Sequence, residues 1–313
     1  MTYSILQLCP LSDALETALA ARGNVKQWFA MSDSARAAWL AAHANEVSAV
    51  VTGGHIGCDN ALIAALPALK LIAINGVGYD KVDLATASAR GVAVTNTPDV
   101  LTDDVADLAV GLVIALLRQL PRADRFVRDG QWRDGGFPLA RKVSGRRFGI
   151  VGLGRIGAAI ATRLAAFGPI AYTGTQEKPV PYDFAPDPVA LAARSDVLIV
   201  ACAATPETRG MIDAGVLDAL GADGYLVNVS RGSVVDETAL IAALDTGRIA
   251  GAALDVFADE PRVPAALIAS APTVLTPHIA SATVETRRAM ADLVLANLDA
   301  FLAGAPLVTP VTA

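Results

Sequence analysis

The stretch "FGIVGLGRIGAAIATRLAAFGPIAYTG", from Phe148 to Gly174, decides the fold of this chain. It opens with a short apolar run typical of a buried strand, and three glycines spaced as GxGxxG follow directly. The next segment, "AAIATRLAAF", has the composition of a helix, and "IAY" indicates a second strand. This order of strand, turn, helix and strand predicts a unit in which a covering helix joins two parallel strands.

The three glycines of the turn would each serve a different purpose. Gly152 permits the tight turn, Gly154 lets the backbone approach a pyrophosphate, and Gly157 lets the helix pack on the strand. The N–H groups at the start of the helix would then bind phosphate oxygens. The alternative is that the three glycines serve only close packing. Their place between a strand and a helix, with a second strand after it, predicts a dinucleotide site instead.

An acidic residue is missing from the end of the second strand. A carboxylate that binds the ribose 2′-hydroxyl is expected there, about 20 residues after the first glycine. The first acid is Glu177, and the positions before it offer Thr173, Thr175 and Gln176 as hydrogen-bond donors. A carboxylate would repel a 2′-phosphate, whereas Lys178 could attract one. The sequence therefore predicts a preference for NADP(H), and the alternative is a permissive site that also accepts NAD(H).

Short apolar runs alternate with helical segments on both sides of this stretch. Strand-like runs before it include "YSILQL", "VSAVVTGG", "LKLIAING" and "GVAVTN", and those after it include "DVLIVAC", "GYLVNVS", "GAALDVF" and "TVLTP". Such alternation predicts parallel sheets with helices on both faces. The pattern restarts at "RRFGIVGLG", so we expect two α/β units in series. A length of 313 residues agrees with two domains.

The composition limits the classes of partner. Hydrophobic residues make up 53% of the chain and charged residues 18%, which predicts packed cores rather than disorder. The net charge is −6 and there is no basic tract, so neither nucleic acid nor an anionic membrane is an expected partner. The longest apolar helical run, Val105 to Leu117, contains Asp107 and is shorter than the roughly 20 residues that a bilayer requires.

The N-terminus and the cysteines predict a cytoplasmic protein. "MTYSILQLCPLSD" has no basic segment followed by a long apolar run, so no signal peptide is expected. Cys9, Cys58 and Cys202 are scattered and lack CxxC spacing, which favours buried thiols in a reducing compartment.

Three charged side chains follow predicted strands of the second unit. Arg231 lies in "VNVSRGSVVDE", Glu260 in "GAALDVFADEP" and His278 in "LTPHIAS". The carboxyl ends of parallel strands collect ligand-binding groups, so these residues should lie close together. A lone histidine is more often structural, but an arginine and a glutamate at neighbouring strand ends favour catalysis by His278. No second histidine or cysteine stands at ligand spacing, so no metal site is predicted.

A second glycine loop, "NGVGYDKVD", spans Asn75 to Asp83 in the first unit. Gly76 and Gly78 would let backbone N–H groups turn into one concavity that suits a carboxylate, and a plain tight turn is equally open. His55, in "TGGHIG", follows another strand and would either line the same cleft or lie on the surface.

Together these motifs resemble the D-isomer-specific 2-hydroxyacid dehydrogenase family over nearly the whole chain. The resemblance rests on "NGVGYDKVD", "TPDVLTDDVADLAVGL", "GIVGLGRIG", "LVNVSRGSVVDE", "AALDVFADEP" and "LTPHIASATVETR". Within the family, "YTGTQEKP", "VACAATPET" and "PHIASATVETRRAMADLV" are most similar to the glyoxylate/hydroxypyruvate and hydroxyphenylpyruvate reductases, a branch that generally uses NADPH. The chain departs from that branch at Thr175, where relatives often carry an arginine that binds the 2′-phosphate.

The resemblance implies an α/β fold of two doubly wound parallel-sheet domains. A Rossmann cofactor domain, residues 99–286, would be inserted in a flavodoxin-like substrate-binding domain made of residues 1–98 and 287–313. The family also implies a homodimer built through the cofactor domain. Its dimerisation arm would be "VRDGQWRDGGFPLARKV", Val127 to Val143, with Trp132 approaching the partner's cleft.

The resemblance further implies NADPH-dependent reduction of small 2-oxoacids, glyoxylate and hydroxypyruvate, to D-2-hydroxyacids. His278 would donate the proton, Glu260 would pair with it and fix its tautomer, and Arg231 would polarise the carbonyl and hold the carboxylate. The substrate would also be bound by His55, Gly76, Val77 and Gly78. The expected cofactor contacts are Thr102, Gly152, Leu153, Gly154, Arg155, Ile156, Gly157, Thr173, Gly174, Thr175, Gln176, Lys178, Ala203, Thr205, Val229, Ser230, Arg231, Asp255, His278, Ala280 and Ser281.

Two alternatives stay open at the level of sequence. One is a hydroxyphenylpyruvate reductase or an NAD-dependent D-2-hydroxyacid dehydrogenase of another specificity. The other is a dinucleotide-sensing binding protein, because some relatives serve as corepressors that respond to NAD(H). Retention of Arg231, Glu260 and His278 favours an enzyme.

Overall fold

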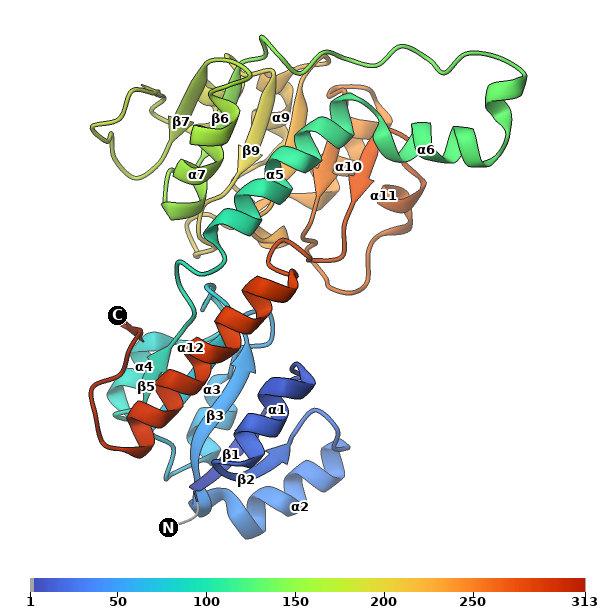
Figure 1. Cartoon of the computed structure of the whole chain (residues 1–313). Coiled ribbons are helices and arrows are strands. Elements are labelled where there is room, and N and C mark those ends of the chain that lie inside the picture. Colours follow the sequence, from blue (N-terminus) through green and yellow to red (C-terminus); the bar gives the residue numbers. More distant parts are fainter. Residues whose placement is uncertain (1–2, 313) are drawn as a thin grey trace. The chain divides into compact units, whose positions relative to one another are not determined.

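The computed structural model describes residues 3–312 and divides the chain into two compact units, each with its own sheet (Figure 1). The first unit comprises residues up to Leu101 and from Thr283 onwards, and the second comprises Thr102–Ala282. We had expected the divisions after residues 98 and 286.

The first unit is built on a six-stranded sheet with the order β13-β5-β4-β3-β1-β2. Five of its strands are parallel: β1 (Tyr3–Gln7), β2 (Gly23–Gln27), β3 (Val47–Gly53), β4 (Leu71–Asn75) and β5 (Ala93–Thr95). The short β13 (Pro310–Val311) pairs antiparallel with β5. The sequence reading missed both edge strands, because β2 is largely polar and β13 is only two residues long.

Most helices of the first unit begin at a polar N-cap. They are α1 (Asp13–Ala20), α2 (Asp33–His43), η1 (Ala44–Glu46), α3 (Asn60–Ala65), α4 (Leu84–Ala89) and α12 (Val284–Leu302). The long α12 returns from the far end of the chain and packs its buried residues Ala291, Val294 and Leu298 with Ile5 and Val51 of the sheet. Burial of these apolar side chains, about 25 cal/mol per Å², joins the last segment of the chain to the first.

The second unit contains an all-parallel, seven-stranded sheet with the order β12-β11-β10-β9-β6-β7-β8. Its strands are β6 (Phe148–Val151), β7 (Ile170–Thr173), β8 (Asp183–Phe184), β9 (Val197–Val200), β10 (Tyr225–Asn228), β11 (Gly251–Leu254) and β12 (Thr273–Leu275). The strand order reverses between β6 and β9. Ligands of doubly wound sheets bind outside the carboxyl ends of the strands at such a switch point.

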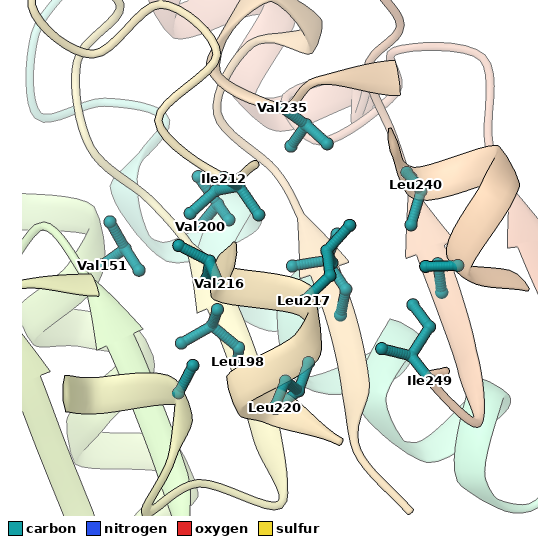
Figure 2. Close-up of a cluster of buried hydrophobic side chains, with 14 of the residues drawn as sticks. Val151, Leu198, Val200, Ile212, Val216, Leu217, Leu220, Val235, Leu240 and Ile249 are labelled. Atoms are coloured by element: carbon teal, nitrogen blue, oxygen red, sulfur yellow. The ribbon is translucent and has the colours of Figure 1, made fainter. Parts of the chain in front are cut away.

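Helices cover this sheet and complete its core. They are α5 (Thr102–Leu117), α6 (Leu120–Arg128), η2 (Gln131–Arg133), α7 (Arg155–Leu164), α8 (Pro188–Ala192), α9 (Ala214–Leu220), η3 (Gly232–Val234), α10 (Glu237–Asp245) and α11 (Ala265–Ala269). Figure 2 shows one apolar cluster, in which Leu198 and Val200 of β9 meet Val216 and Leu217 of α9. The central strands β9 and β10 are buried along their length, and their residues are apolar apart from Asn228 at the end of β10 and the hydroxyl of Tyr225.

The apolar run from Val105 to Leu117 lies in α5, as predicted for a core helix, with Ala106, Ala109 and Val113 fully buried. Within residues 3–312, no helix combines the length and the apolar character needed to span a membrane. The fold class predicted from the sequence, two parallel-sheet α/β units, is confirmed.

The cysteines carry free thiols that are shielded to different degrees. Cys9 and Cys58 are buried as predicted, whereas Cys202 is half-buried. Burial raises the pKa of the Cys58 thiol to about 12 and that of Cys202 to about 11. The thiolate is the reactive form of cysteine, so neither side chain is a candidate nucleophile.

Candidate active site

The glycine turn between β6 and α7 has the geometry that its sequence predicts. Gly152 adopts a φ of +91°, and a methyl group built on it would lie 2.5 Å from Cα of Cys202. A methyl group on Gly157 would lie 2.0 Å from the carbonyl oxygen of Gly152. Gly154 has no neighbour within 4 Å of that position. Close packing therefore requires glycine at positions 152 and 157, and Gly154 leaves an open face for a ligand.

The same turn presents the free end of a helix. Gly154 is the N-cap of α7 and offers no capping side chain, and the first helical bond runs from the Ala158 N–H to the Gly154 carbonyl. The N–H groups of the first turn thus have no partner within the helix. With the positive end of the helix dipole, they suit the phosphates of a dinucleotide. Arg155, at the first helical position, is exposed.

The end of β7 lies beside this turn, since the Gly152 N–H donates to the Thr173 carbonyl at 2.9 Å. Thr173 itself is buried, while Gly174, Thr175 and Gln176 are exposed. No carboxylate stands in this segment. The place where a ribose-binding acid is expected is therefore open and carries no carboxylate.

The loop after β9 is shaped by a residue that the sequence reading missed. The Thr208 hydroxyl accepts from the Thr205 N–H at 2.8 Å and donates to the Ala203 carbonyl at 2.9 Å. Ala203 and Thr205, both expected cofactor contacts, are exposed. Thr102, the expected contact at the start of α5, is half-buried.

The loop after β10 is held by Asn228, a buried side chain that we did not predict. Its amide donates to the Arg231 carbonyl at 3.0 Å, and its oxygen accepts from the Ser230 N–H at 3.0 Å. The Ser230 hydroxyl in turn donates to the Cys202 carbonyl of the neighbouring loop. Val229 and Ser230 are buried, and Arg231 is half-buried. The backbone that carries Arg231 is thus fixed from inside the sheet.

Asp255, at the end of β11, organises the loop that follows β12. Its carboxylate accepts from the Thr276 hydroxyl at 2.7 Å and from the N–H groups of Ile279 and Ala280 at 2.9 and 3.0 Å. The His278 N–H donates to the Asp255 carbonyl at 2.8 Å. Asp255 is fully buried, and in this structure it holds the loop of His278. A contact between Asp255 and a nicotinamide stays a prediction.

His278 and Glu260 form a direct pair. Nδ1 of His278 lies 2.7 Å from Oε2 of Glu260, and Oε1 of Glu260 accepts from the Phe257 N–H at 3.0 Å. The two side chains are 33% and 25% exposed, so solvent or a ligand can reach them. His278 has a φ of +54°, a conformation that costs energy for a residue with a side chain and that concentrates at functional sites.

The electrostatics keep Glu260 ionised. Burial raises the pKa of this carboxyl, but the hydrogen bonds from His278 and from the Phe257 N–H outweigh that effect, helped by the positive charge of Arg231. The net result is a pKa below the ordinary value. An ionised Glu260 accepts a hydrogen bond from the Nδ1–H of His278, so Nε2 is the ring nitrogen that we assign to proton exchange with a substrate.

Gly232 brings the Arg231 loop against the segment that precedes Glu260. A methyl group on Gly232 would lie 1.9 Å from the carbonyl carbon of Phe257 and 2.3 Å from the Ala258 nitrogen. Only glycine permits this approach. The structure therefore brings the three predicted catalytic side chains together from the ends of β10, β11 and β12.

The glycine loop of the first unit is held by its carbonyl groups. Gly76 accepts from the Thr97 N–H at 2.9 Å, and Val77 accepts from the Asn96 amide at 2.8 Å. Among the residues that the structure describes, no backbone bond engages the N–H groups of Val77 and Gly78. His55, after β3, is exposed in the same unit. Backbone N–H groups of this kind suit a carboxylate ligand, and carboxylate binding by this loop stays a prediction.

Between residues 3 and 312 no group of three or more histidine, cysteine, aspartate or glutamate side chains is arranged to hold an ion. The site is built instead from one imidazole, one carboxylate, one guanidinium and a glycine turn. Such a set suits proton transfer to an oxygen beside a bound dinucleotide.

Comparisons with known proteins place these features in context. The model of the NAD-binding domain of D-isomer specific 2-hydroxyacid dehydrogenases matches residues 110–280. The chain is 50% identical to glyoxylate/hydroxypyruvate reductase A of Arabidopsis thaliana, with 99% of each protein covered. It is 49% identical to hydroxyphenylpyruvate reductase of Plectranthus scutellarioides, with 98% of each covered.

Among solved structures, a similar one is the NADPH-dependent glyoxylate/hydroxypyruvate reductase of Sinorhizobium meliloti in complex with NADP and malonate. The TM-score is 0.93 at 43% identity, and the match covers 100% of this chain and 97% of the other.

Proposed function

The chain belongs to the D-isomer-specific 2-hydroxyacid dehydrogenase family, and from this premise we propose that it reduces small 2-oxoacids to D-2-hydroxyacids with NADPH. Glyoxylate and hydroxypyruvate are the proposed substrates, in line with the relatives of that activity. The family resemblance and the enzyme class that the sequence predicted are confirmed. NADP(H) is the preferred cofactor in this proposal, and NAD(H) remains usable.

One observation carries the proposal: the His278–Glu260 pair stands with Arg231 at the carboxyl ends of three adjacent strands, in the unit that also holds the glycine turn. When bound, the nicotinamide supplies the hydride that reduces C2 of the oxoacid. Negative charge then develops on the carbonyl oxygen. A cation and a proton donor beside that oxygen stabilise the transition state.

The roles of the three side chains follow from their chemistry. His278 donates a proton from Nε2 to the carbonyl oxygen, while Glu260 holds Nδ1 and stabilises the charged ring. Arg231 polarises the carbonyl and binds the substrate carboxylate, for which a planar guanidinium is well shaped. In the first unit, the N–H groups of Val77 and Gly78 are proposed to bind a carboxylate.

The phosphates of the cofactor are assigned to the turn from Gly152 to Gly157. Gly154 leaves room for the pyrophosphate, and the first N–H groups of α7 donate to it. Thr102, Ala203, Thr205, Val229, Ser230, Asp255, Ala280 and Ser281 complete the proposed cofactor site.

A second candidate activity is the reduction of hydroxyphenylpyruvate, because a relative of that name is 49% identical. The two activities differ only in the side chain that the oxoacid carries. Rates with glyoxylate, hydroxypyruvate and 4-hydroxyphenylpyruvate, measured under one condition, decide between them.

The enzyme is further proposed to act as a homodimer in the cytoplasm. The arm from Val127 to Val143 exposes large apolar side chains, with Trp132 68% and Leu139 98% accessible. Beside it lies a groove of about 590 Å³, lined among others by Phe126, Phe137 and Ile268. Large exposed apolar side chains beside a groove are typical of a protein interface. Light scattering of the intact chain and of Leu139→Asp tests the dimer: a monomeric wild type would contradict it.

The test of the proposed function is a comparison of kcat/KM for NADPH and NADH at saturating glyoxylate. A preference for NADPH of tenfold or more, about 1.4 kcal/mol in the transition state, supports the proposal. Equal use or a preference for NADH would show that the site is permissive. Absence of turnover with glyoxylate, hydroxypyruvate and hydroxyphenylpyruvate would contradict the reductase itself.

A further inference from the structure

We propose that Lys178 is the cation that binds the 2′-phosphate of NADP(H), and that Tyr172 is the residue that positions it. This inference rests on the proposed use of NADP(H) and names the groups that select it. The lysine stands in the loop after β7 and is held there by a buried phenol.

Tyr172 lies near the end of β7 and is fully buried. Its ring packs against Phe184 of β8, with the ring centres 5.4 Å apart. Its hydroxyl accepts from the Lys178 N–H at 2.6 Å and lies 3.4 Å from the Lys178 carbonyl oxygen, to which it donates. Both backbone groups of Lys178 are thus tied to one rigid side chain in the sheet, and the loop between β7 and β8 is folded back.

The folded loop brings the lysine to the glycine turn. Nζ of Lys178 donates to the Leu153 carbonyl at 2.6 Å. An ammonium has three N–H donors, so this bond fixes its place and leaves two for a ligand. Lys178 is exposed as a residue, so a ligand can reach it. Leu153 stands between Gly152 and Gly154, and the Gly152 N–H is bonded to the last residue of β7.

The ammonium of Lys178 lies where a dinucleotide's ribose is expected, at the end of the second strand beside the glycine turn. A 2′-phosphate would bring nearly two negative charges there. The neighbouring Gly174 and Thr175 carry no charge, and no carboxylate comes before Glu177. Lys178 can therefore act as a point charge for the phosphate, with the exposed Thr175 and Gln176 as neutral donors.

A purely structural role for Lys178, capping the Leu153 carbonyl, makes a different prediction. Loss of a cap would loosen the glycine turn and weaken the binding of every adenine nucleotide alike. Loss of a phosphate partner would weaken the binding only of ligands that carry the 2′-phosphate. Binding of two small ligands separates the cases without any need for catalysis.

The experiment is calorimetric titration of the full-length protein with adenosine 2′,5′-bisphosphate and with 5′-AMP. For the wild type we expect tighter binding of the bisphosphate. Lys178→Gln should weaken the binding of the bisphosphate about tenfold, because one charge-assisted contact at an exposed site is lost. The affinity for 5′-AMP should stay unchanged. Lys178→Arg, which keeps the charge, should retain most of the selectivity. Added salt should weaken bisphosphate binding by the wild type more than by Lys178→Gln.

Tyr172→Phe tests the positioning role, since it removes only the hydroxyl that holds Lys178. We expect a three- to tenfold weaker bisphosphate complex, on the order of the loss of one hydrogen bond, with 5′-AMP again unchanged. Tyr225→Phe, at another buried tyrosine of the same sheet, and Lys142→Gln, at an exposed lysine of the same unit, are the matched controls. If Tyr172→Phe does not fold, the Lys178 variants still decide the identity of the cation.

The proposal is overturned if Lys178→Gln weakens the binding of the bisphosphate and of 5′-AMP equally, or changes the binding of neither. It is also overturned if Arg155→Gln, at the exposed first position of α7, removes the selectivity and Lys178→Gln does not. These outcomes are independent of the proposed reaction. A protein that binds the bisphosphate through Lys178 and turns over no oxoacid would refute the reductase and leave the phosphate site intact.

Discussion

The imidazole of His278 is held by the carboxylate of Glu260, with Nδ1 and Oε2 2.7 Å apart. The two residues follow different strands, β12 and β11, and the second oxygen of Glu260 is fixed by the Phe257 N–H. Because both oxygens are engaged, the carboxylate can impose one tautomer and one orientation on the ring. The proposed proton transfer from His278 depends on that pair.

Removal of the charge at Glu260 should slow the reaction without loss of the fold. In Glu260→Gln the ring can adopt the wrong tautomer, so we expect a fall in kcat of up to about 10²-fold, less than for loss of the acid itself. Steady-state kinetics with NADPH and glyoxylate measure it. The matched control is Glu237→Gln: Glu237 accepts from the Ala258 N–H in the same segment but is not bonded to His278. Equal losses in both variants would assign the effect to the segment rather than to the pair.

The lowered pKa of Glu260 predicts how stability depends on pH. A carboxyl whose pKa falls on folding stabilises the native state above its ordinary value of 4.5, and this contribution is lost as the pH falls through the folded-state pKa. The difference in unfolding free energy between wild type and Glu260→Gln should therefore shrink as the pH falls below about 5. Urea unfolding at a series of pH values measures this difference. A difference that grows toward acid pH would contradict the direction of the shift.

Gly232 should be indispensable for activity, because a side chain there meets backbone atoms. The β-carbon of Gly232→Ala would lie 1.9 Å from the carbonyl carbon of Phe257, so the loops of Arg231 and Glu260 must move apart. We expect at least a tenfold loss in kcat/KM, since small misplacements of catalytic groups are costly. Gly111→Ala, in α5 with no atom within 4 Å, is the control and should be neutral or slightly stabilising. A fully active Gly232→Ala would show that the two loops need not touch.

Asn297 should be a major determinant of stability in the first unit. This fully buried amide accepts from the N–H groups of Val308 and Thr309 and donates to the Leu293 carbonyl and the Thr309 hydroxyl. Asn297→Ala leaves several buried groups unpaired and should cost about 2–3 kcal/mol of unfolding free energy. The midpoint of urea unfolding measures the loss, and Asp292→Ala, at an exposed position of the same helix, should change little. A change below about 0.5 kcal/mol in the unfolding free energy would show that the bonds from Asn297 to Val308 and Thr309 contribute little to stability.

The parts of the site that depend on local chemistry could be predicted from the sequence. The spacing of Gly152, Gly154 and Gly157 predicts their roles. The turn excludes a side chain at Gly152, a close approach excludes one at Gly157, and Gly154 leaves an open face. Likewise Glu260 and His278 follow clear apolar strands, and parallel strands bring their carboxyl ends to one edge.

The residues that were missed act through backbone groups supplied from elsewhere in the chain. Asn228 and Thr208 hold loops by bonding carbonyl and N–H groups, which every residue possesses and no sequence pattern marks. Tyr172 was read only as part of an apolar strand, and its bond to Lys178 depends on how the following loop folds back. The edge strand β2 was missed because its residues are mostly polar, with little apolar periodicity to reveal them.

The most direct test of the central claim is kcat/KM for glyoxylate with NADPH, measured for the wild type and for His278→Ala. If His278 is the general acid, the variant should lose about 10²–10⁴ in rate while it binds NADPH as the wild type does. A His278→Ala protein with near-normal turnover would contradict the account.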